Sequence, residues 1–419
     1  VCSSDLRLRL LRPLAHIRVG LAVGVDDPLL CEVDATSYFP SFRWCRRLQR
    51  HHCFEVRGVP YEQVAPAQGS ALMPLVAQVT SAAIARAPPP QAPDAAWVAA
   101  GLSIVYDNFL LSGDVEDVAA RAADLAARAR HAGVVLGTDT GVTTRLVSCG
   151  LEFDVAPRRW RLKPAWAERA ADTLNRAPTS VREWQVAAGL AVWACRATLR
   201  PLAAVHNVLR PILGQSARPS EALRELRALR AVVHANEWRT LLDHGVPLRA
   251  PPDTAIVVYS DASLTGAGAV IAGGAHRAWR WPAPRPASQK QLCEAEAATL
   301  ALEFVERVDA VVVLVLDNEG VAGWLLSGNP AAQRAVPLLE RMRATLAHRR
   351  QRLWVALVPS ADMLADGLSR GDTHPPAPAS PQALAQLRRG ATEVAWAAAC
   401  PAHSPCVDLS KETGRVGGT

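Results

Sequence analysis

Short apolar runs rich in β-branched residues alternate along this chain with longer segments of helical periodicity. Residues 29–33 form a mostly apolar run that ends at Asp34, and residues 101–105 and 109–112 form two more. Runs of this length predict strands. Residues 166–229 instead place Ala, Leu, Trp and Arg at helical spacing, which predicts a helical region. The first part of the chain is therefore expected to contain a small sheet followed by helices.

A second pattern of strands and helices follows further along the chain. Residues 255–259 and 311–316 are short β-branched runs, and residues 292–305 between them have the spacing of a helix with one packed face. Alternation of strand and helix predicts an α/β domain with a central sheet. Proline-rich breaks separate the regions, at residues 87–93, 247–252 and 374–381. The fold class predicted for the chain is α/β.

Composition and charge narrow the class of protein. Half of the 419 residues are apolar and a fifth are charged, as in a folded globular protein, and no apolar stretch is long enough to span a bilayer. The net charge of +7 fits a polyanionic partner. Nine cysteines without a CxxC pair are typical of reduced thiols, so we expect an intracellular protein, in the cytoplasm or the nucleus. Because no apolar stretch could span a bilayer, we expect no membrane partner. Residues 1–6 read like a translated adapter and are expected to be an artefact.

The first set of candidate catalytic residues lies on the early strands. A hairpin whose polar tip is Tyr106-Asp107-Asn108 would present the Asp107 carboxylate beside Asp34, at the end of a neighbouring strand. Two such carboxylates can hold Mg²⁺, which prefers oxygen ligands, and paired ions stabilise the attacking and leaving oxygens of a phosphoryl transfer. The alternative is that each Asp is a solvated turn residue at a strand end.

In order along the chain, these segments resemble the motifs of reverse transcriptases. Residues 34–39, Asp-Ala-Thr-Ser-Tyr-Phe, resemble motif A, and Gln68-Gly69 followed by Pro74 resembles motif B. Residues 105–108, Val-Tyr-Asp-Asn, stand where the family has Tyr-x-Asp-Asp. The resemblance implies that Asp34 and Asp107 are catalytic metal ligands. It also implies a substrate-binding pocket lined by Phe39 (the steric gate against a ribose 2′-hydroxyl), Gln68, Gly69 and Asn108.

Three features depart from the reverse transcriptase pattern. Asn108 and Val105 replace an Asp and a Tyr of motif C. The lysine expected after Gly133 is absent, and 33 residues precede Asp34, so we expect the fingers to be truncated.

The second set consists of four acids, each at or near the end of an expected element. Asp261 follows a strand and precedes a Gly-rich turn, Glu294 lies on the next helix, Asp317 ends a strand, and Asp366 follows the last strand. Clustered acids repel one another unless cations lie among them, so clustering implies bound metal. The alternative is an unrelated α/β domain in which the acids occur by chance.

This series resembles ribonuclease H through the pieces SDAS, GAGAV, LDN and ADGLSR in that order. The resemblance implies that the catalytic and metal-binding residues are Asp261, Glu294, Asp317 and Asp366, which would hold two Mg²⁺ or Mn²⁺ ions. Glu296 lies two residues beyond Glu294 and should point elsewhere on the helix. We interpret Asp362 as structural.

Taken together, the resemblances imply a fragment of a retroelement polyprotein. Its expected parts are a reverse transcriptase palm of α+β type with truncated fingers at 1–160, a helical thumb or connection at 161–250, an α/β ribonuclease H domain at 251–373, and a linker or tail at 374–419. The lineage that it resembles most is the DIRS-like tyrosine-recombinase branch, with gypsy-type elements as the alternative.

The implied activities are RNA-directed DNA synthesis and hydrolysis of RNA in RNA–DNA hybrids, with two divalent ions in each active site. The implied partners are an RNA template, a DNA primer, RNA–DNA hybrid and deoxynucleoside triphosphates. The rival interpretations are a degenerate element copy with an inactive palm and a non-catalytic scaffold that binds nucleic acid. The sequence leaves the oligomeric state open.

Overall fold

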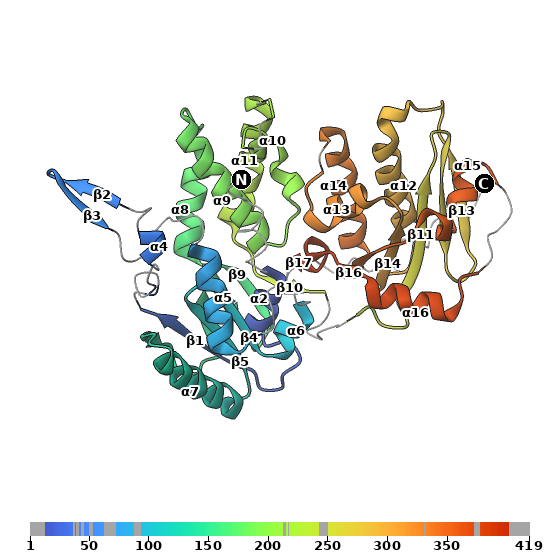
Figure 1. The fold of residues 1–419 in the computed structure, drawn as a ribbon. Coiled ribbons are helices and arrows are strands. Elements are labelled where there is room, and N and C mark those ends of the chain that lie inside the picture. Colours follow the sequence, from blue (N-terminus) through green and yellow to red (C-terminus); the bar gives the residue numbers. More distant parts are fainter. Residues whose placement is uncertain are drawn as a thin grey trace.

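A computed structural model of the chain shows a mixed α/β fold built around three larger sheets (Figure 1). It describes residues 13–36, 38, 42, 46–49, 53–62, 73–87, 94–212, 215–216, 218–242, 250–330, 332–372 and 378–401. The predicted α/β class is confirmed. Among the helices in these ranges, none combines the length and the apolar character needed to cross a bilayer.

The first sheet is antiparallel and contains the early strands predicted from the sequence. Its order is β4 (Leu102–Val105), β5 (Asn108–Gly113), β1 (Leu29–Ala35) and β6 (Leu136–Asp139). The helices around it are α2 (Pro13–Gly20), α5 (Met73–Ala85), α6 (Asp94–Ala99) and α7 (Val115–His131). A separate hairpin, β2 (Cys53–Val56) with β3 (Val59–Glu62), projects from the body near the short helix α4 (Arg46–Gln49) (Figure 1).

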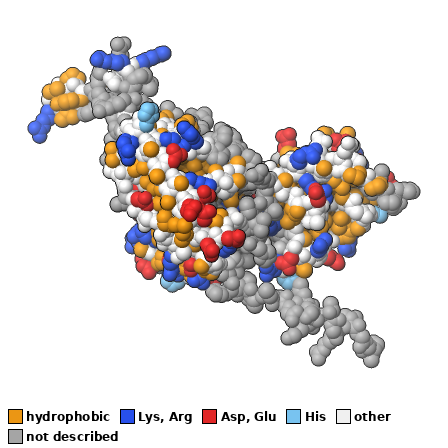
Figure 2. Space-filling model, turned by 90° about the horizontal axis from the view of Figure 1, so that it is seen from below, with side chains coloured by type: hydrophobic (Ala, Val, Ile, Leu, Met, Phe, Trp, Pro, Cys, Tyr) orange, Lys and Arg blue, Asp and Glu red, His pale blue; other side chains and the backbone are white. Residues whose placement is uncertain are grey.

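Side chains of the first sheet alternate between two cores, as the two-residue period of a strand requires. Val33 and Phe109 pack with residues of α5 and α7, whereas Leu30 and Leu110 pack with residues of α2 and the second sheet. Asp34 therefore lies on the face away from α5 and α7. On the outer surface of α7, acidic and basic side chains are mixed rather than gathered into one basic patch (Figure 2).

The second sheet is also antiparallel and joins residues from distant parts of the chain. Its order is β17 (Ala399–Pro401), β10 (Arg239–Leu241), β9 (Arg159–Leu162), β8 (Leu151–Asp154) and β7 (Arg145–Ser148). The helical region predicted beside it is confirmed as α8 (Pro164–Asn175), α9 (Val181–Ala197), η1 (Leu202–Val205), α10 (His206–Leu209) and α11 (Pro219–Ala235). A capping box starts α9, where Ser180 and Glu183 each bind the other's backbone N–H.

The third sheet has a parallel centre. Its order is β13 (His276–Arg280), β12 (Gly266–Ile271), β11 (Ile256–Ala262), β14 (Val311–Leu316), β15 (Arg352–Leu357) and β16 (Thr392–Glu393). Strands β11, β14 and β15 run parallel, and the remaining neighbours pair antiparallel. The strand–helix–strand pattern predicted from the sequence for this region is confirmed.

Helices cover both faces of the third sheet, which makes it a three-layer structure. Helices α12 (Lys290–Phe304), α13 (Glu319–Ser327) and α14 (Val336–His348) pack against one face, through a core that includes Val258 and Leu314. On the other face, α15 (Asp366–Arg370) and α16 (Pro381–Gly390) pack with Tyr259 and Val315. Short 3₁₀ turns complete the described elements, at η2 (Ala287–Gln289), η3 (Gln333–Ala335), η4 (Ser360–Asp362) and η5 (Ala395–Ala397).

Residues 378–401 contribute to two sheets, the third and the second. Helix α16 and strand β16 extend the third sheet, and β17 pairs with β10 of the second. The division of the chain into domains, including the tail expected from residue 374, stays a prediction.

A buried ion-pair triad connects α2 to the third sheet. Glu393 on β16 accepts hydrogen bonds from Arg18 of α2, at 2.8 and 3.0 Å, and from Arg352 of β15. The side chains are 9 %, 1 % and 5 % exposed, respectively. Burial alone would raise the pKa of Glu393, but the two guanidinium charges outweigh burial and hold that pKa below its ordinary value of 4.5.

Replacing Glu393 by Gln should destabilise the protein by about 3–5 kcal/mol, because it removes the negative charge that Glu393 places beside two buried arginines. Since the pKa of Glu393 is lowered on folding, its contribution is present above pH 4.5 and is lost as the pH falls below it. Urea unfolding at pH values above and below 4.5 measures both the cost of the substitution and the pH dependence of the wild type. Glu303→Gln, in the more exposed pair with Arg341, is the control and should cost less than about 1 kcal/mol. Equal losses in the two variants would contradict the importance of the triad.

Candidate metal centre

Asp261 lies in β11, and its partner on β12 is a glycine for a steric reason. It pairs in register with Gly268 and is 4 % exposed. A Cβ atom at Gly268 would lie 2.6 Å from the Ala365 carbonyl oxygen and 2.8 Å from Leu368 Cβ. Only glycine allows α15 to approach β12 this closely. This approach lets the buried Ser369 hydroxyl donate a hydrogen bond of 2.6 Å to Asp261.

Glu294 projects from α12 toward the end of β11. The helix packs on the sheet through small residues, including Ala295, Ala298 and Ala301, so its backbone lies close to the strand. The Glu294 carboxylate is 3 % exposed and accepts a hydrogen bond from the Ala262 backbone N–H at 3.1 Å.

Asp317 follows β14 and reaches the same edge of the sheet as Asp261. This follows from topology, because β11 and β14 are parallel neighbours and their carboxyl ends meet at one edge. The Ser360 hydroxyl donates a hydrogen bond of 2.6 Å to Asp317. The next residue, Asn318, caps α13 by accepting a hydrogen bond from Val321 N–H, so the chain turns away immediately after the carboxylate.

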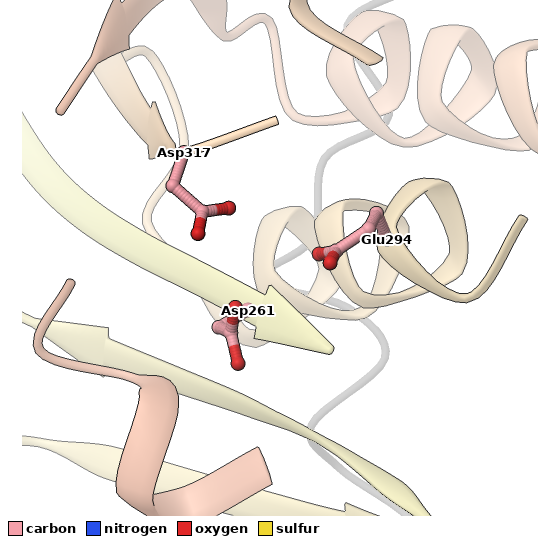
Figure 3. Close-up of side chains that lie close together, drawn as sticks. All are labelled: Asp261, Glu294 and Asp317. Carbon is pink, nitrogen blue, oxygen red and sulfur yellow. The ribbon is translucent and has the colours of Figure 1, made fainter. Parts of the chain in front are cut away.

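The three carboxylates converge on a common space (Figure 3). One oxygen of each lies within 4.8 Å of the other two. Burial, followed by the charges of Asp261 and Asp317, raises the pKa of Glu294 from 4.5 to about 8. The pKa of Asp261 is also raised, mainly by burial. Without a cation, the cluster keeps a proton at neutral pH.

The donor set fits a hard divalent cation. Three carboxylates offer the oxygen ligands that Mg²⁺ and Mn²⁺ prefer, and a bound cation would remove the repulsion that raises their pKa values. In the described ranges, these residues form the one group of three His, Cys, Asp or Glu side chains close enough to share an ion.

Asp366, the fourth acid predicted from the sequence, lies near this group but outside it. It begins α15, and its carboxylate pairs with Arg370 at 2.8 Å. Its charge is close enough to contribute to the raised pKa of Asp261. Ser369 connects the two acids, since its hydroxyl also lies 2.9 Å from the Asp366 carbonyl oxygen. The (i, i+4) spacing of Asp366 and Arg370 on a helix was a signal available in the sequence.

Glu296 lies away from the acidic group, as the helix geometry predicts. Its carboxylate pairs with Arg285 at 2.6 Å. Asp362 lies in η4 and is exposed.

The first sheet brings Asp34 and Asp107 onto adjacent strands. Asp34 pairs in register with Asn108, and the Asp107 carbonyl oxygen accepts a hydrogen bond from Ala35 N–H at 2.9 Å. Burial, and then the charge of Asp107, raises the pKa of Asp34. The Asn108 amide donates to the Asp107 carboxylate at 3.2 Å. No third acid, His or Cys joins this pair within metal-binding distance in the part of the chain that the structure describes.

Glu32 is a neighbour of Asp34 that the sequence analysis missed. It lies two residues earlier on β1, so the strand period places it on the same face. Its carboxylate accepts a hydrogen bond of 2.6 Å from Ser148, and burial, despite that bond, raises its pKa with a contribution from Asp34. The predicted pocket residues Phe39, Gln68 and Gly69 lie outside the described residues.

Comparison with known proteins gives no family assignment for the chain. No family model matches the sequence, and no curated protein matches it. Two solved structures with similarity are foamy viral protease–reverse transcriptases. The complex with double-stranded DNA (a form termed dRH) has a TM-score of 0.42 at 12% identity, over 81% of this chain and 58% of that one. The RNA/DNA hybrid complex has a TM-score of 0.40 at 13% identity, over 87% and 48%. The chain thus spans less than two thirds of either protein, and similarity at this level assigns no activity.

The raised pKa of Glu294 predicts how pH and metal affect stability. A group whose pKa is raised on folding stabilises the protein below its ordinary pKa, and the stabilisation is lost as the pH rises through the folded value. In a chelator, the free energy of unfolding should therefore fall between pH 4.5 and about 8. The loss should be at most about 5 kcal/mol, since the pKa is raised from 4.5 to about 8 and each pKa unit corresponds to about 1.4 kcal/mol.

Mg²⁺ should reverse this loss, and Glu294→Gln should flatten the profile because its amide is neutral at every pH. Thermal unfolding with and without Mg²⁺ provides the measurement, with Glu296→Gln as the matched control on the same helix. A pH profile that is the same in Glu294→Gln as in the wild type would show that this carboxyl does not carry the effect.

Proposed function

We propose that the C-terminal α/β part of this chain is a metal-dependent nuclease of ribonuclease H type that cleaves the RNA strand of RNA–DNA hybrids. The observation that carries the proposal is the convergence of Asp261, Glu294 and Asp317 from two parallel strands and a helix within 4.8 Å. The order of the motifs along the chain supports the same reaction. Asp366 would complete the ligand set once its carboxylate is released from Arg370.

In this proposal, hydrolysis adds water across a P–O3′ bond, leaving a 3′-hydroxyl and a 5′-phosphate. Two bound Mg²⁺ or Mn²⁺ ions would supply the activation of water and the stabilisation of the leaving oxygen. The chain's own residues hold the site in place. Ser369 orients Asp261, the Ala262 N–H orients Glu294, and Ser360 orients Asp317. Such supporting hydrogen bonds fix the ligand rotamers before the substrate binds.

Single neutral substitutions of the three carboxylates should each reduce cleavage roughly 100-fold or more, because each removes a charged ligand worth several kcal/mol of transition-state stabilisation. The variants are Asp261→Asn, Glu294→Gln and Asp317→Asn. The full chain is assayed on a labelled RNA–DNA hybrid in Mg²⁺ and in Mn²⁺. Glu296→Gln is the control, since Glu296 pairs with Arg285 outside the cluster.

A wild-type chain that is folded and binds Mg²⁺ but leaves the hybrid intact would contradict the proposed reaction and favour the scaffold interpretation. Cleavage that survives all three substitutions would remove the cluster from the reaction.

We further propose that the first sheet is the palm of an RNA-directed DNA polymerase, with Asp34 and Asp107 as metal ligands. The adjacency of these residues on β1 and the β4–β5 turn supports this. The RNA template, the DNA primer and deoxynucleoside triphosphates are the proposed substrates. For the lineage of the element, we propose the DIRS-like branch in preference to the gypsy-type elements.

Asp34→Asn should eliminate primer extension by the chain, or by a longer form of it, because it removes a charge from the proposed metal pair. Asp139→Asn is the matched control. Asp139 lies on the neighbouring strand β6, opposite Val33, and its carboxylate accepts hydrogen bonds from Gly141 N–H and from the Cys31 thiol. Incorporation of labelled nucleotide on an RNA template gives the readout. Extension that persists in Asp34→Asn would exclude this assignment.

A further inference from the structure

A cavity of about 330 Å³ lies between the helical region and the third sheet, away from both acidic sites. Its walls come from the residues that follow α9, from α11, from β10 and the residues beside it, from α14 and from η5. The residues that line it are Thr198, Leu199, Arg200, Ala231, Val232, Ala235, Glu237, Arg239, Leu242, Arg343, Leu346, Ala347, Trp396 and Ala397.

Three of the lining residues are arginines, and two of them, Arg200 and Arg239, have no ion-pair partner among the described residues. Within the described ranges, the Arg239 side chain donates only to the Glu237 carbonyl oxygen at 2.8 Å. Arg343 pairs with Glu340 at 3.0 Å. The single carboxylate among the lining residues belongs to Glu237. The cavity therefore has an excess of positive charge.

These cations affect one another electrostatically. Burial and then the charge of Arg200 lower the pKa of Arg239 to about 10, against a smaller opposing effect of Glu237. Burial and then the charge of Arg343 lower the pKa of Arg200, against a smaller opposing effect of Glu340. Arginines in a protein normally remain charged, so this repulsion persists in the folded chain at neutral pH. A bound anion with several negative charges would relieve it and would accept charge-assisted hydrogen bonds in return.

The shape of the cavity favours a small ligand over a nucleic-acid strand. Its lining residues come from five short segments around one half-open space, whereas strand binding uses an extended groove that follows many phosphates. Its volume is at the lower end of the range for small-molecule sites. Leu199, Leu346 and Trp396 provide apolar surface beside the arginines.

We propose that this cavity binds a small anion with two or more phosphate groups, either free pyrophosphate or the phosphate chain of a nucleotide. The bound anion would bridge Arg200 and Arg239, from the helical region and second sheet, to Arg343 of α14. It would thereby stabilise the packing of the helical region against the third sheet. The inference does not depend on the proposed nuclease or polymerase activity, because none of the acidic residues assigned there lines the cavity.

The test uses the full chain in EDTA, so that binding at the metal centre does not contribute. Pyrophosphate, dATP and adenosine are titrated by calorimetry, and the shift in thermal unfolding is measured alongside. Pyrophosphate should bind in one-to-one stoichiometry and raise the unfolding temperature. Tighter binding of dATP would identify a nucleotide as the source of the phosphates, and tighter binding of pyrophosphate would identify the free anion. Adenosine alone should not bind.

Arg239→Met and Arg200→Met should each weaken pyrophosphate binding by about 10- to 100-fold, as expected for the loss of a charge-assisted hydrogen bond. Arg227→Met, on the exposed side of α11, is the matched control and should leave the affinity unchanged. The ligand-free Arg239→Met and Arg200→Met proteins should be as stable as the wild type or more stable, because each loses an uncompensated charge. Arg343→Gln serves as a third variant if either of the others fails to fold.

Three outcomes would overturn the proposal. The first is the absence of pyrophosphate and dATP binding at millimolar concentrations. The second is equal weakening by Arg227→Met, which would indicate non-specific attraction to a basic protein. The third is binding of a single-stranded oligonucleotide that depends on these arginines while pyrophosphate does not bind, which would make the cavity part of a nucleic-acid surface.

Discussion

The parallel pairing of β11 and β14 is the constraint on which the candidate metal centre depends. Because the two strands run in the same direction in register, Asp261 and Asp317 leave the sheet at one edge, although 56 positions separate them in the sequence. The connection between parallel strands needs a crossover helix, and α12 is that helix. Glu294 on this helix faces the end of β11, where its carboxylate accepts a hydrogen bond from the Ala262 N–H. An antiparallel pairing would move Asp317 to the opposite edge.

The close approach of the α15 backbone to β12 then determines how firmly the Asp261 carboxylate is held. Gly268 allows α15 to lie against β12, and the Ser369 hydroxyl reaches Asp261 as a consequence. The result is a buried acidic group whose mutual repulsion opposes folding, since the pKa of Glu294 is raised to about 8. Stability and cation binding are coupled here: the geometry that suits a divalent ion is unfavourable without one.

The sequence predicted those features that depend on local pattern. The strand at Ile256–Ala262, the strand at Val311–Leu316 and the helix between them follow from β-branched runs and helical spacing, and the convergence of three acids follows once the sheet is parallel. Features that depend on distant partners were not predictable. Arg18 meets Glu393 across 375 positions, and no local pattern marks either residue. Asp366 is a different case, because its partner Arg370 lies only four residues along the same helix and motif order alone grouped this acid with the others.

Buried charge is handled in three different ways in this chain, and the differences locate its candidate sites. In the triad, Glu393 is matched by Arg18 and Arg352, so the charge is compensated internally and its role is structural. In the acidic cluster, three carboxylates oppose one another, and the missing charge is positive. In the arginine cavity, Arg200 and Arg239 are half-buried and form no ion pair among the described residues, so the excess charge is positive. Because an uncompensated charge held away from water opposes folding, the acidic cluster is a candidate site for a cation, and the cavity is the site proposed above for an anion. The overall charge of +7 contains none of this information, since the two unmatched clusters are opposite in sign and lie in different parts of the molecule.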